Sequence, residues 1–258
     1  MHDDAEAVVF SLVKTLKGRG MLSLFTDKHG KISAGAFLRE RGGAAAALRP
    51  FTYGSYEIKR LQSGFHIIKG EVISSFYALG EDVDRYVNAA YALEFTDKLL
   101  PEEAPAPGLF ALLLEFLRMM EKRTREFDTP VLAYMLKALR LWGAAPELDS
   151  CAACGEPTPS PAWFSVAEGG VLCGGCAAEE ARALDSGRDK LLYKTNFDII
   201  NVMKYLLEHP MGRFKGLAMD ADVARTLRRL LRGHISYHLD IPRLKTESLL
   251  DGAFPDES

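Results

Sequence analysis

The sequence predicts an α+β protein in which a small closed barrel of five strands precedes an all-α helical domain carrying a four-cysteine insertion. Three observations support this prediction. Roughly the first 75 residues alternate short β-branched and aromatic runs with glycine-marked turns. After Gly80, apolar residues recur at helical spacing instead. All four cysteines lie in two Cys-x-x-Cys pairs between residues 151 and 176, which predicts a compact insertion in the helical part.

Five segments of the N-terminal part are predicted strands. They are residues 6–16, 21–26, 31–37, 51–60 and 65–76. The turns at 27–30 and 61–64 each end in a glycine that can adopt positive φ. Closure into a barrel is favoured because it removes exposed sheet edges. Residues 38–50 are rich in alanine, and we expect them to form a short helix that plugs one end of the barrel.

Five further segments are predicted helices, at residues 81–100, 109–127, 129–143, 197–209 and 220–239. In the third of these, Thr129 can cap the helix, Pro130 fits its first turn and Gly143 can end it. The elements define an expected domain order. A barrel spans residues 1–79, helical parts span 80–149 and 179–250, the insertion spans 150–178, and a disordered tail spans 251–258.

The two cysteine pairs predict a structural zinc site. Its ligands are Cys151, Cys154, Cys173 and Cys176. Each pair places two thiolates on one tight turn, and two such turns make the tetrahedron of sulfurs that zinc accepts at about 2.3 Å per bond. Four cysteines fill the coordination shell and leave no position for a catalytic water, so the metal would act as a staple. The core beneath it would consist of Trp163, Phe164, Val166, Val171 and Leu172.

Disulfides and redox chemistry are the alternatives for these cysteines. Disulfides suit secreted domains, but the chain opens with the acidic stretch "MHDDAEA" and not with an apolar signal segment. A thioredoxin-like motif would need a single pair beside a βαβ unit. Both alternatives therefore fit the sequence less well than zinc.

Charge and composition limit the classes of function that the chain can have. The chain of 258 residues has a net charge of −3 and 48% hydrophobic residues, which is ordinary for a globular protein. No apolar run approaches the ~20 residues of a membrane span, so we expect a cytoplasmic protein with no membrane partner. The first 80 residues carry 11 Lys and Arg against 7 Asp and Glu, an excess that can attract an anion locally. No phosphate-binding loop, nucleophile elbow or dinucleotide fingerprint occurs, and we expect a protein that is not an enzyme.

Several strings, in order, resemble the RecO family of bacterial recombination mediators. They are "FTDKHGKISAGA", "LRPFTYGSYEI", "EVISSFYAL", "LRLWGAAPELDSCAACG", "GGVLCGGC" and "LRRLLRGHISYHLDIPRLKTESLL". Together they span most of the chain. The loop "FLRERGGAAAALRP" departs from the family because members are often richer in Lys and Arg there. With fewer basic residues in this loop, we expect the chain to bind DNA more weakly or to depend on a partner for DNA binding.

The resemblance implies a fold and a function. The fold is an N-terminal OB barrel followed by a helical domain with a zinc-finger-like insertion. The function is DNA repair in the RecF recombination pathway. It includes binding of single- and double-stranded DNA, annealing of complementary strands, and help in replacing single-strand-binding protein with RecA. The implied partners are RecR and the acidic C-terminal tail of single-strand-binding protein, and the implied location is the bacterial nucleoid.

Candidate phosphate contacts lie in or beside the barrel loops, where a DNA backbone could run. They are Lys14, Lys17, Arg19, Lys28, Lys31, Arg39, Arg41 and Arg49. Phe51, Tyr53 and Tyr56 could stack on bases, although such alternating positions are more often core. A second possible DNA path is the stripe of Arg225, Arg228, Arg229 and Arg232. A protein–protein adaptor whose barrel has little affinity for DNA is the alternative function.

The predicted helix at 129–143 offers a candidate site for the acidic tail of single-strand-binding protein. Such a receptor needs an apolar pocket with a cation at its rim. Lys137, Arg140 and Trp142 provide that combination, although apolar residues and cations in such a pattern are more often bundle core and solvated charges. His234 and His238 are spaced i, i+4 and could ligate a metal, but core or surface histidines are commoner.

Overall fold

The computed structural model describes residues 2–15, 18–37, 43–62, 64–157, 163–183, 192–195 and 197–251. The chain divides into two compact units, which we call the barrel unit (Met1–Thr124) and the cysteine unit (Arg125–Asp251). This division falls between residues 124 and 125, inside the helix predicted at 109–127, whereas the domain order expected from the sequence begins the helical domain at residue 80. The tail expected at 251–258 lies almost entirely outside the described residues.

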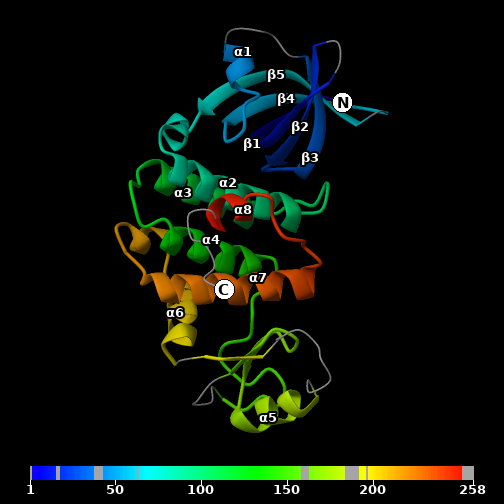
Figure 1. Ribbon diagram of the computed structural model, residues 1–258. Coiled ribbons are helices and arrows are strands. Elements are labelled where there is room, and N and C mark those ends of the chain that lie inside the picture. The colour runs from blue at the N-terminus through cyan, green and yellow to red at the C-terminus, as the bar shows by residue number, and fades with distance from the viewer. Residues whose placement is uncertain are drawn as a thin grey trace. The chain divides into compact units, whose positions relative to one another are not determined.

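The barrel unit begins with five strands. They are β1 (His2–Lys14), β2 (Arg19–Thr26), β3 (Gly30–Phe37), β4 (Tyr53–Leu61) and β5 (Gly64–Ser74). Their order is β1-β2-β3-β5-β4, and the first half of β1 pairs with β4 to close the barrel (Figure 1). Only β3 and β5 pair in parallel among the described pairs. A five-stranded closed barrel in this order is an OB fold, as the sequence predicted.

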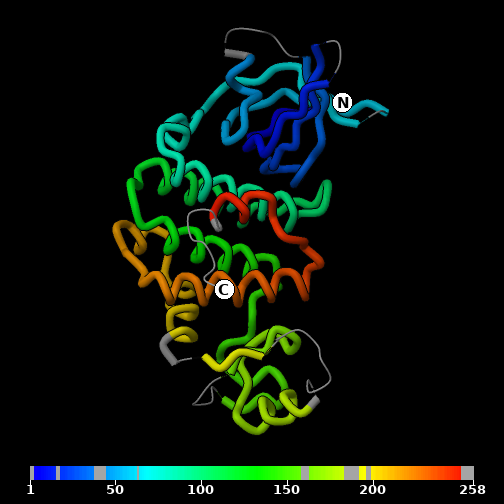
Figure 2. Tube along the Cα trace, in the orientation of Figure 1, coloured from blue at the N-terminus to red at the C-terminus, as the bar shows by residue number. Residues whose placement is uncertain are grey.

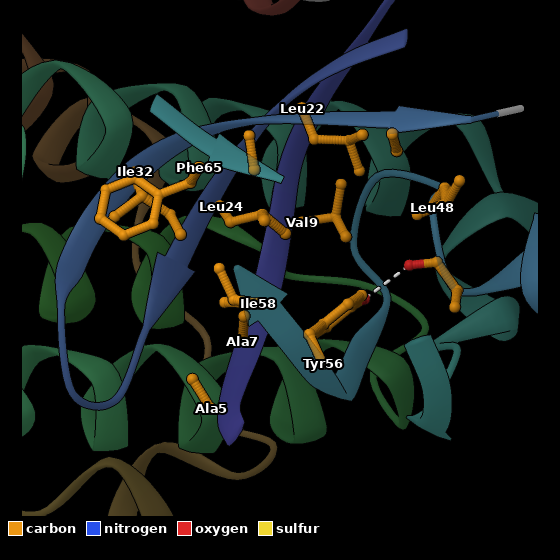
Figure 3. Packing of buried hydrophobic residues seen from close by; sticks show 13 residues of the cluster. Ala5, Ala7, Val9, Leu22, Leu24, Ile32, Leu48, Tyr56, Ile58 and Phe65 are labelled. Carbon is orange, nitrogen blue, oxygen red and sulfur yellow. Dashed lines mark hydrogen bonds between the residues drawn. The ribbon is translucent and has the colours of Figure 1, made fainter. Parts of the chain in front are cut away.

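Inward-facing residues fill the barrel because side chains alternate along each strand (Figure 3). Leu22, Leu24 and Ile32 are fully buried there. The alanine-rich segment contains the short helix α1 (Gly43–Ala46), after which Ala47 and Leu48 join the barrel core. The carbonyl of Ala47 accepts a hydrogen bond of 2.5 Å from the buried Tyr56 hydroxyl. The segment therefore contributes to the interior of the barrel, in line with the predicted plug.

Three helical elements complete the barrel unit: η1 (Tyr77–Glu81), α2 (Val83–Leu99) and α3 (Pro107–Glu121). Asp82 caps α2 by accepting a hydrogen bond of 2.7 Å from the backbone N–H of Arg85. The rings of Phe25 on β2 and Phe110 on α3 meet edge to face at 5.3 Å. These contacts place α2 and α3 against the outer side of the barrel.

The cysteine unit is built around α4 (Asp128–Leu141), whose residues from Thr129 to Leu139 are all buried. The other helices are α5 (Gly174–Ala183), α6 (Phe197–Glu208), η2 (Met211–Phe214), α7 (Ala221–Leu239) and α8 (Glu247–Asp251). A small sheet of order β7-β6-β8 joins β6 (Trp163–Ser165), β7 (Gly170–Leu172) and β8 (Leu192–Lys194). Figure 2 traces this path from α4 through the sheet and back to α6 and α7.

None of the helices in the described part of the chain combines the length and the apolar character that a bilayer crossing requires.

Candidate metal centre and nucleic-acid interface

The four cysteines converge on one point of the cysteine unit. The sulfurs of Cys151, Cys154, Cys173 and Cys176 all lie within 4.8 Å of one another. A tight turn brings the first pair together: the Gly155 N–H donates to the Cys151 carbonyl at 2.8 Å, and Gly155 has φ of 76°. The second pair flanks the start of α5, where the Cys176 N–H points at the Cys173 sulfur at 3.5 Å. The predicted four-cysteine cluster is confirmed.

The environment of the sulfurs fits a metal ion. Burial raises the pKa of the Cys151 thiol, but backbone N–H groups led by that of Cys173 outweigh it and lower the pKa to about 6. The N–H of Cys173 lies 3.3 Å from the Cys151 sulfur. In contrast, hydrogen bonds with the Cys173 and Cys154 sulfurs raise the pKa of Cys176. Four thiolates this close would repel one another strongly, and a divalent cation with a preference for sulfur resolves that repulsion.

The small sheet supports the cysteines from one face. Trp163 and Leu172 are directly opposite each other on β6 and β7 and pack with Cys151. Phe164 and Val171, the other opposed pair, are fully buried but do not belong to that cluster, because alternate residues of a strand point to opposite faces. The core predicted beneath the metal is therefore divided between the two faces of the sheet.

His234 and His238 on α7 tie the cysteine loop to the helices. The Nε2 of His234 lies 2.8 Å from the carbonyl of Ala144, and the Nε2 of His238 lies 2.7 Å from the carbonyl of Val166. Their rings lie 4.6 Å apart. Since a carbonyl only accepts, each Nε2 carries the hydrogen and donates it. These nitrogens are therefore used in hydrogen bonds, which argues against metal ligation by the pair.

We predict that His234 makes the cysteine unit less stable in mild acid. Burial lowers the pKa of His234, and nearby His238 lowers it further, against the opposing effect of the hydrogen bond to Ala144. The stabilisation is present above the unfolded pKa of about 6.5 and is lost as the pH falls toward the folded pKa, by up to about 1.4 kcal/mol per pH unit. Unfolding measured between about pH 7 and about pH 5 should show this slope. The slope should flatten in His234→Gln; equal slopes in wild type and His234→Gln would refute the assignment.

The candidate phosphate contacts have different environments. Lys17, Arg39 and Arg41 lie outside the described residues, whereas Lys14, Arg19, Lys28 and Arg49 are exposed on the barrel. Lys28 also contacts the Asp4 carbonyl and lies 3.7 Å from the Asp3 carboxylate.

Lys31 occupies a site inside the barrel unit. Only 14% of its side chain is exposed, and its Nζ donates to the Asp97 carbonyl at 2.6 Å and lies 3.7 Å from the Asp97 carboxylate. Asp97 also accepts a hydrogen bond of 3.0 Å from the Ser23 hydroxyl. Lys31 therefore joins the barrel to α2, and its charge is already paired.

The aromatic residues suggested for base stacking are buried. Tyr56 lies in the barrel core, while Phe51 and Tyr53 face the rings of Tyr86 and Phe110 on the helices, at 5.4 and 6.3 Å. Among the described residues of the barrel strands, Phe37 is the exposed aromatic side chain, which the sequence reasoning missed. The alternation of side chains along residues 31–37 could have revealed this exposure. Ile32, Ala34 and Ala36 point into the barrel, so Phe37 points outward.

The alternative DNA path along α7 is largely neutralised by acidic partners. Arg225 contacts Asp222, Arg228 contacts Asp128, and Arg232 lies 3.8 Å from Glu247. The guanidinium of Arg229 lies over the ring of Tyr193 at 5.3 Å. The structure thus gives these arginines intramolecular roles.

The candidate tail site on α4 is only partly at the surface. Lys137 is buried and donates a hydrogen bond of 2.7 Å to the Leu207 carbonyl, so it does not stand at the rim of a pocket. Arg140 is exposed near the end of α4, beside the half-buried C-cap residue Trp142.

Fold and site together define a class of protein that joins an OB-fold barrel to a helical region carrying a four-cysteine site suited to a metal. The model of the family described as recombination protein O, C terminal, matches residues 80–248. The chain belongs to the RecO family. It is 33% identical over 223 residues to DNA repair protein RecO of Alkaliphilus metalliredigens, covering 85% of this chain and 87% of the relative. It is 30% identical over 253 residues to DNA repair protein RecO of Pelotomaculum thermopropionicum, covering 96% and 93%.

Proposed function

We propose that this chain is a non-enzymatic DNA repair mediator that binds single- and double-stranded DNA and anneals complementary strands. With RecR it helps load RecA onto DNA coated with single-strand-binding protein, at the nucleoid in the cytoplasm. The observation that carries the proposal is the OB barrel of a RecO-family chain with Lys14, Arg19 and Arg49 exposed on its surface. Such a barrel combines a positive backbone track with a surface for bases.

The metal in this proposal is one structural zinc ion per chain. The donor set of four sulfurs supports it, since a shell of four thiolates is closed and leaves no open position for a catalytic water. The zinc would hold Cys151 and Cys154 against Cys173 and Cys176, and the partners of the protein would bind elsewhere.

The proposed partners include RecR and the acidic tail of single-strand-binding protein. Arg140 is the cation suited to clamp the tail carboxylate, beside Leu141, which is 53% exposed, and Trp142. The burial of Lys137 removes the second cation that the sequence suggested for this role.

The alternative is a protein–protein adaptor with little affinity for DNA. The pairing of Lys31 with Asp97 favours the adaptor function to a small degree, because this pairing leaves fewer cations on the barrel to contact phosphates.

Salt dependence separates the two functions. We expect the affinity of the wild type for a labelled single-stranded oligonucleotide to fall steeply with salt, because bound cations release counterions. The variant Lys14→Gln/Arg19→Gln/Arg49→Gln should have a slope smaller by roughly 0.7 per lost contact. Lys69→Gln, which removes a cation paired with Glu71 at 2.5 Å, should keep the wild-type slope. Weak binding with no salt dependence in the wild type would support the adaptor instead.

A further inference from the structure

Half of the outer face of β2 and β3 is covered within the barrel unit. Ser23 and Lys31 contact Asp97 on α2, and Phe25 packs on Phe110 of α3. These residues lie toward the end of β2 and the start of β3. The remaining half, from the start of β2 and the end of β3, has no such cover among the described contacts.

The uncovered half carries a strip of exposed apolar side chains that crosses four strands, which we call the barrel strip. It consists of Val13 (62% exposed), Met21 (48%), Phe37 (70%) and Ile68 (53%). Val13 is opposite Met21, Met21 is opposite Gly35, and Gly35 is opposite His66. The next outward position along β3 is Phe37. Register therefore places Val13, Met21 and Phe37 on one face, and Ile68, two residues beyond His66, is the exposed extra residue of a β-bulge in β5.

Gly35 and His66 lie side by side on this face. Gly35 lies between Met21 and His66, and a Cβ added there would come within 3.1 Å of the His66 Nδ1. The imidazole of His66 therefore occupies the space that a side chain at position 35 would need, and its ring forms part of this face.

Two cations flank the strip. Arg19 is directly opposite Phe37, and its guanidinium lies over the Phe37 ring, 5.2 Å from the centroid. Lys14 is exposed at the end of β1. Further along β5, Glu71 is exposed, but its carboxylate is paired with Lys69 at 2.5 Å. An apolar surface flanked by cations suits a ligand that is both aromatic and anionic.

We propose that the barrel strip stacks the unpaired bases of single-stranded DNA, with Phe37 as the main ring and Arg19 bridging from that ring to a phosphate. This inference rests on the proposed function and deepens it. Duplex DNA keeps its base faces inside the helix, so it engages the barrel cations but not the strip. The chain thus uses separate elements for the two forms of DNA: cations for both, and the strip for single strands alone.

The test compares three labelled probes: an oligothymidylate, a duplex of equal length, and an abasic oligomer that keeps the phosphates. Loss of one stacked base weakens binding by about 5- to 150-fold. We expect Phe37→Ala to weaken oligothymidylate binding in that range and to leave the duplex and abasic affinities within about twofold. Phe37→Trp should retain oligothymidylate binding. The matched control is Tyr77→Ala, which removes an equally exposed aromatic ring (73%) from η1 of the same unit and should bind all probes as the wild type does.

Other outcomes overturn the inference. Equal losses for all three probes in Phe37→Ala would mean that the ring supports the fold or the phosphate path. Unchanged DNA binding together with weakened binding of RecR would make the strip a protein-docking surface. A wild type that binds none of the probes would instead contradict the proposed function itself.

Discussion

Changing Cys151 to Ser is expected to unfold the segment from Cys151 to Ala183 while the barrel unit stays folded. Cys151 is buried and contacts Leu172 and Ala177 in a cluster of few residues, too small to hold this segment by itself. Structural zinc contributes about 10–16 kcal/mol of apparent binding free energy in small sites. The barrel has its own core and lies in the other compact unit. Limited proteolysis with mass spectrometry should show new cleavage confined to the cysteine unit.

Two arms make this result specific. Ala152→Ser alters a neighbouring half-buried position without removing a sulfur and should resist protease as the wild type does. Removal of metal from the wild type by a chelator should reproduce the Cys151→Ser pattern, and metal analysis before chelation should find about one zinc per chain. Free thiols without zinc in the purified wild type, or loss of protease resistance in the barrel of the variant, would contradict this expectation.

Changing Gly30 to Ala is expected to detach the α2–α3 loop from the barrel and to lower the free energy of unfolding by at least about 3 kcal/mol. Gly30 has φ of +71°, and an added Cβ would lie 2.0 Å from the Ala104 carbonyl oxygen. The loop is held at this place by the Glu103 N–H, which donates to the Lys31 carbonyl at 2.7 Å. Neither backbone segment can move without losing this bond.

Gly18→Ala is the matched control for the Gly30 variant. Gly18 has a similar φ of +67° but has no atom within 4 Å of the added Cβ. The substitution Gly18→Ala should therefore lower the free energy of unfolding only by the left-handed backbone strain of about 1–2 kcal/mol. Urea unfolding of both variants measures the difference, and equal losses would show that the loop does not press on the barrel at Gly30.

The strands of the barrel could be predicted because their signal is local. Residues 31–37 alternate strictly, and the turns around them contain glycine. The first residues of β1 could not be predicted: residues 2–5 form a strand because they pair with Lys59–Tyr56 of β4, far along the chain. The helix expected at 109–127 ends at Glu121, with Lys122 as its C-cap, and Glu126 adopts positive φ, which is incompatible with a continued helix.

Within the cysteine unit, the helices α4, α6 and α7 match their predicted ranges closely, whereas the small sheet and α5 around the ligands were not predicted. The strands β6, β7 and β8 have three residues each, too few for a period to emerge. Helix α5 begins with two glycines, which are poor helix formers, directly after Cys173. The four ligands could be found because the Cys-x-x-Cys spacing is itself the signal.

The roles of individual lysines depend on contacts that a linear pattern does not contain. Lys31 is paired with Asp97 across 66 positions of sequence, and Lys137 donates to Leu207 across 70. The sequence suggested Lys137 as a cation at the rim of a pocket, but α4 is buried all round from Thr129 to Leu139. The partner of a lysine side chain thus depends on the tertiary structure and cannot be read from the neighbouring sequence.

The proposed DNA path over the barrel is tested most directly by photo-crosslinking. A single-stranded oligonucleotide that carries 5-iodouracil would be irradiated in complex with the full chain, and the adducts would be mapped by mass spectrometry. We predict adducts on β2 and β3, at Met21 and Phe37 above all. Adducts confined to α7, around Arg225 and Arg229, would contradict the barrel path and place the DNA on the cysteine unit.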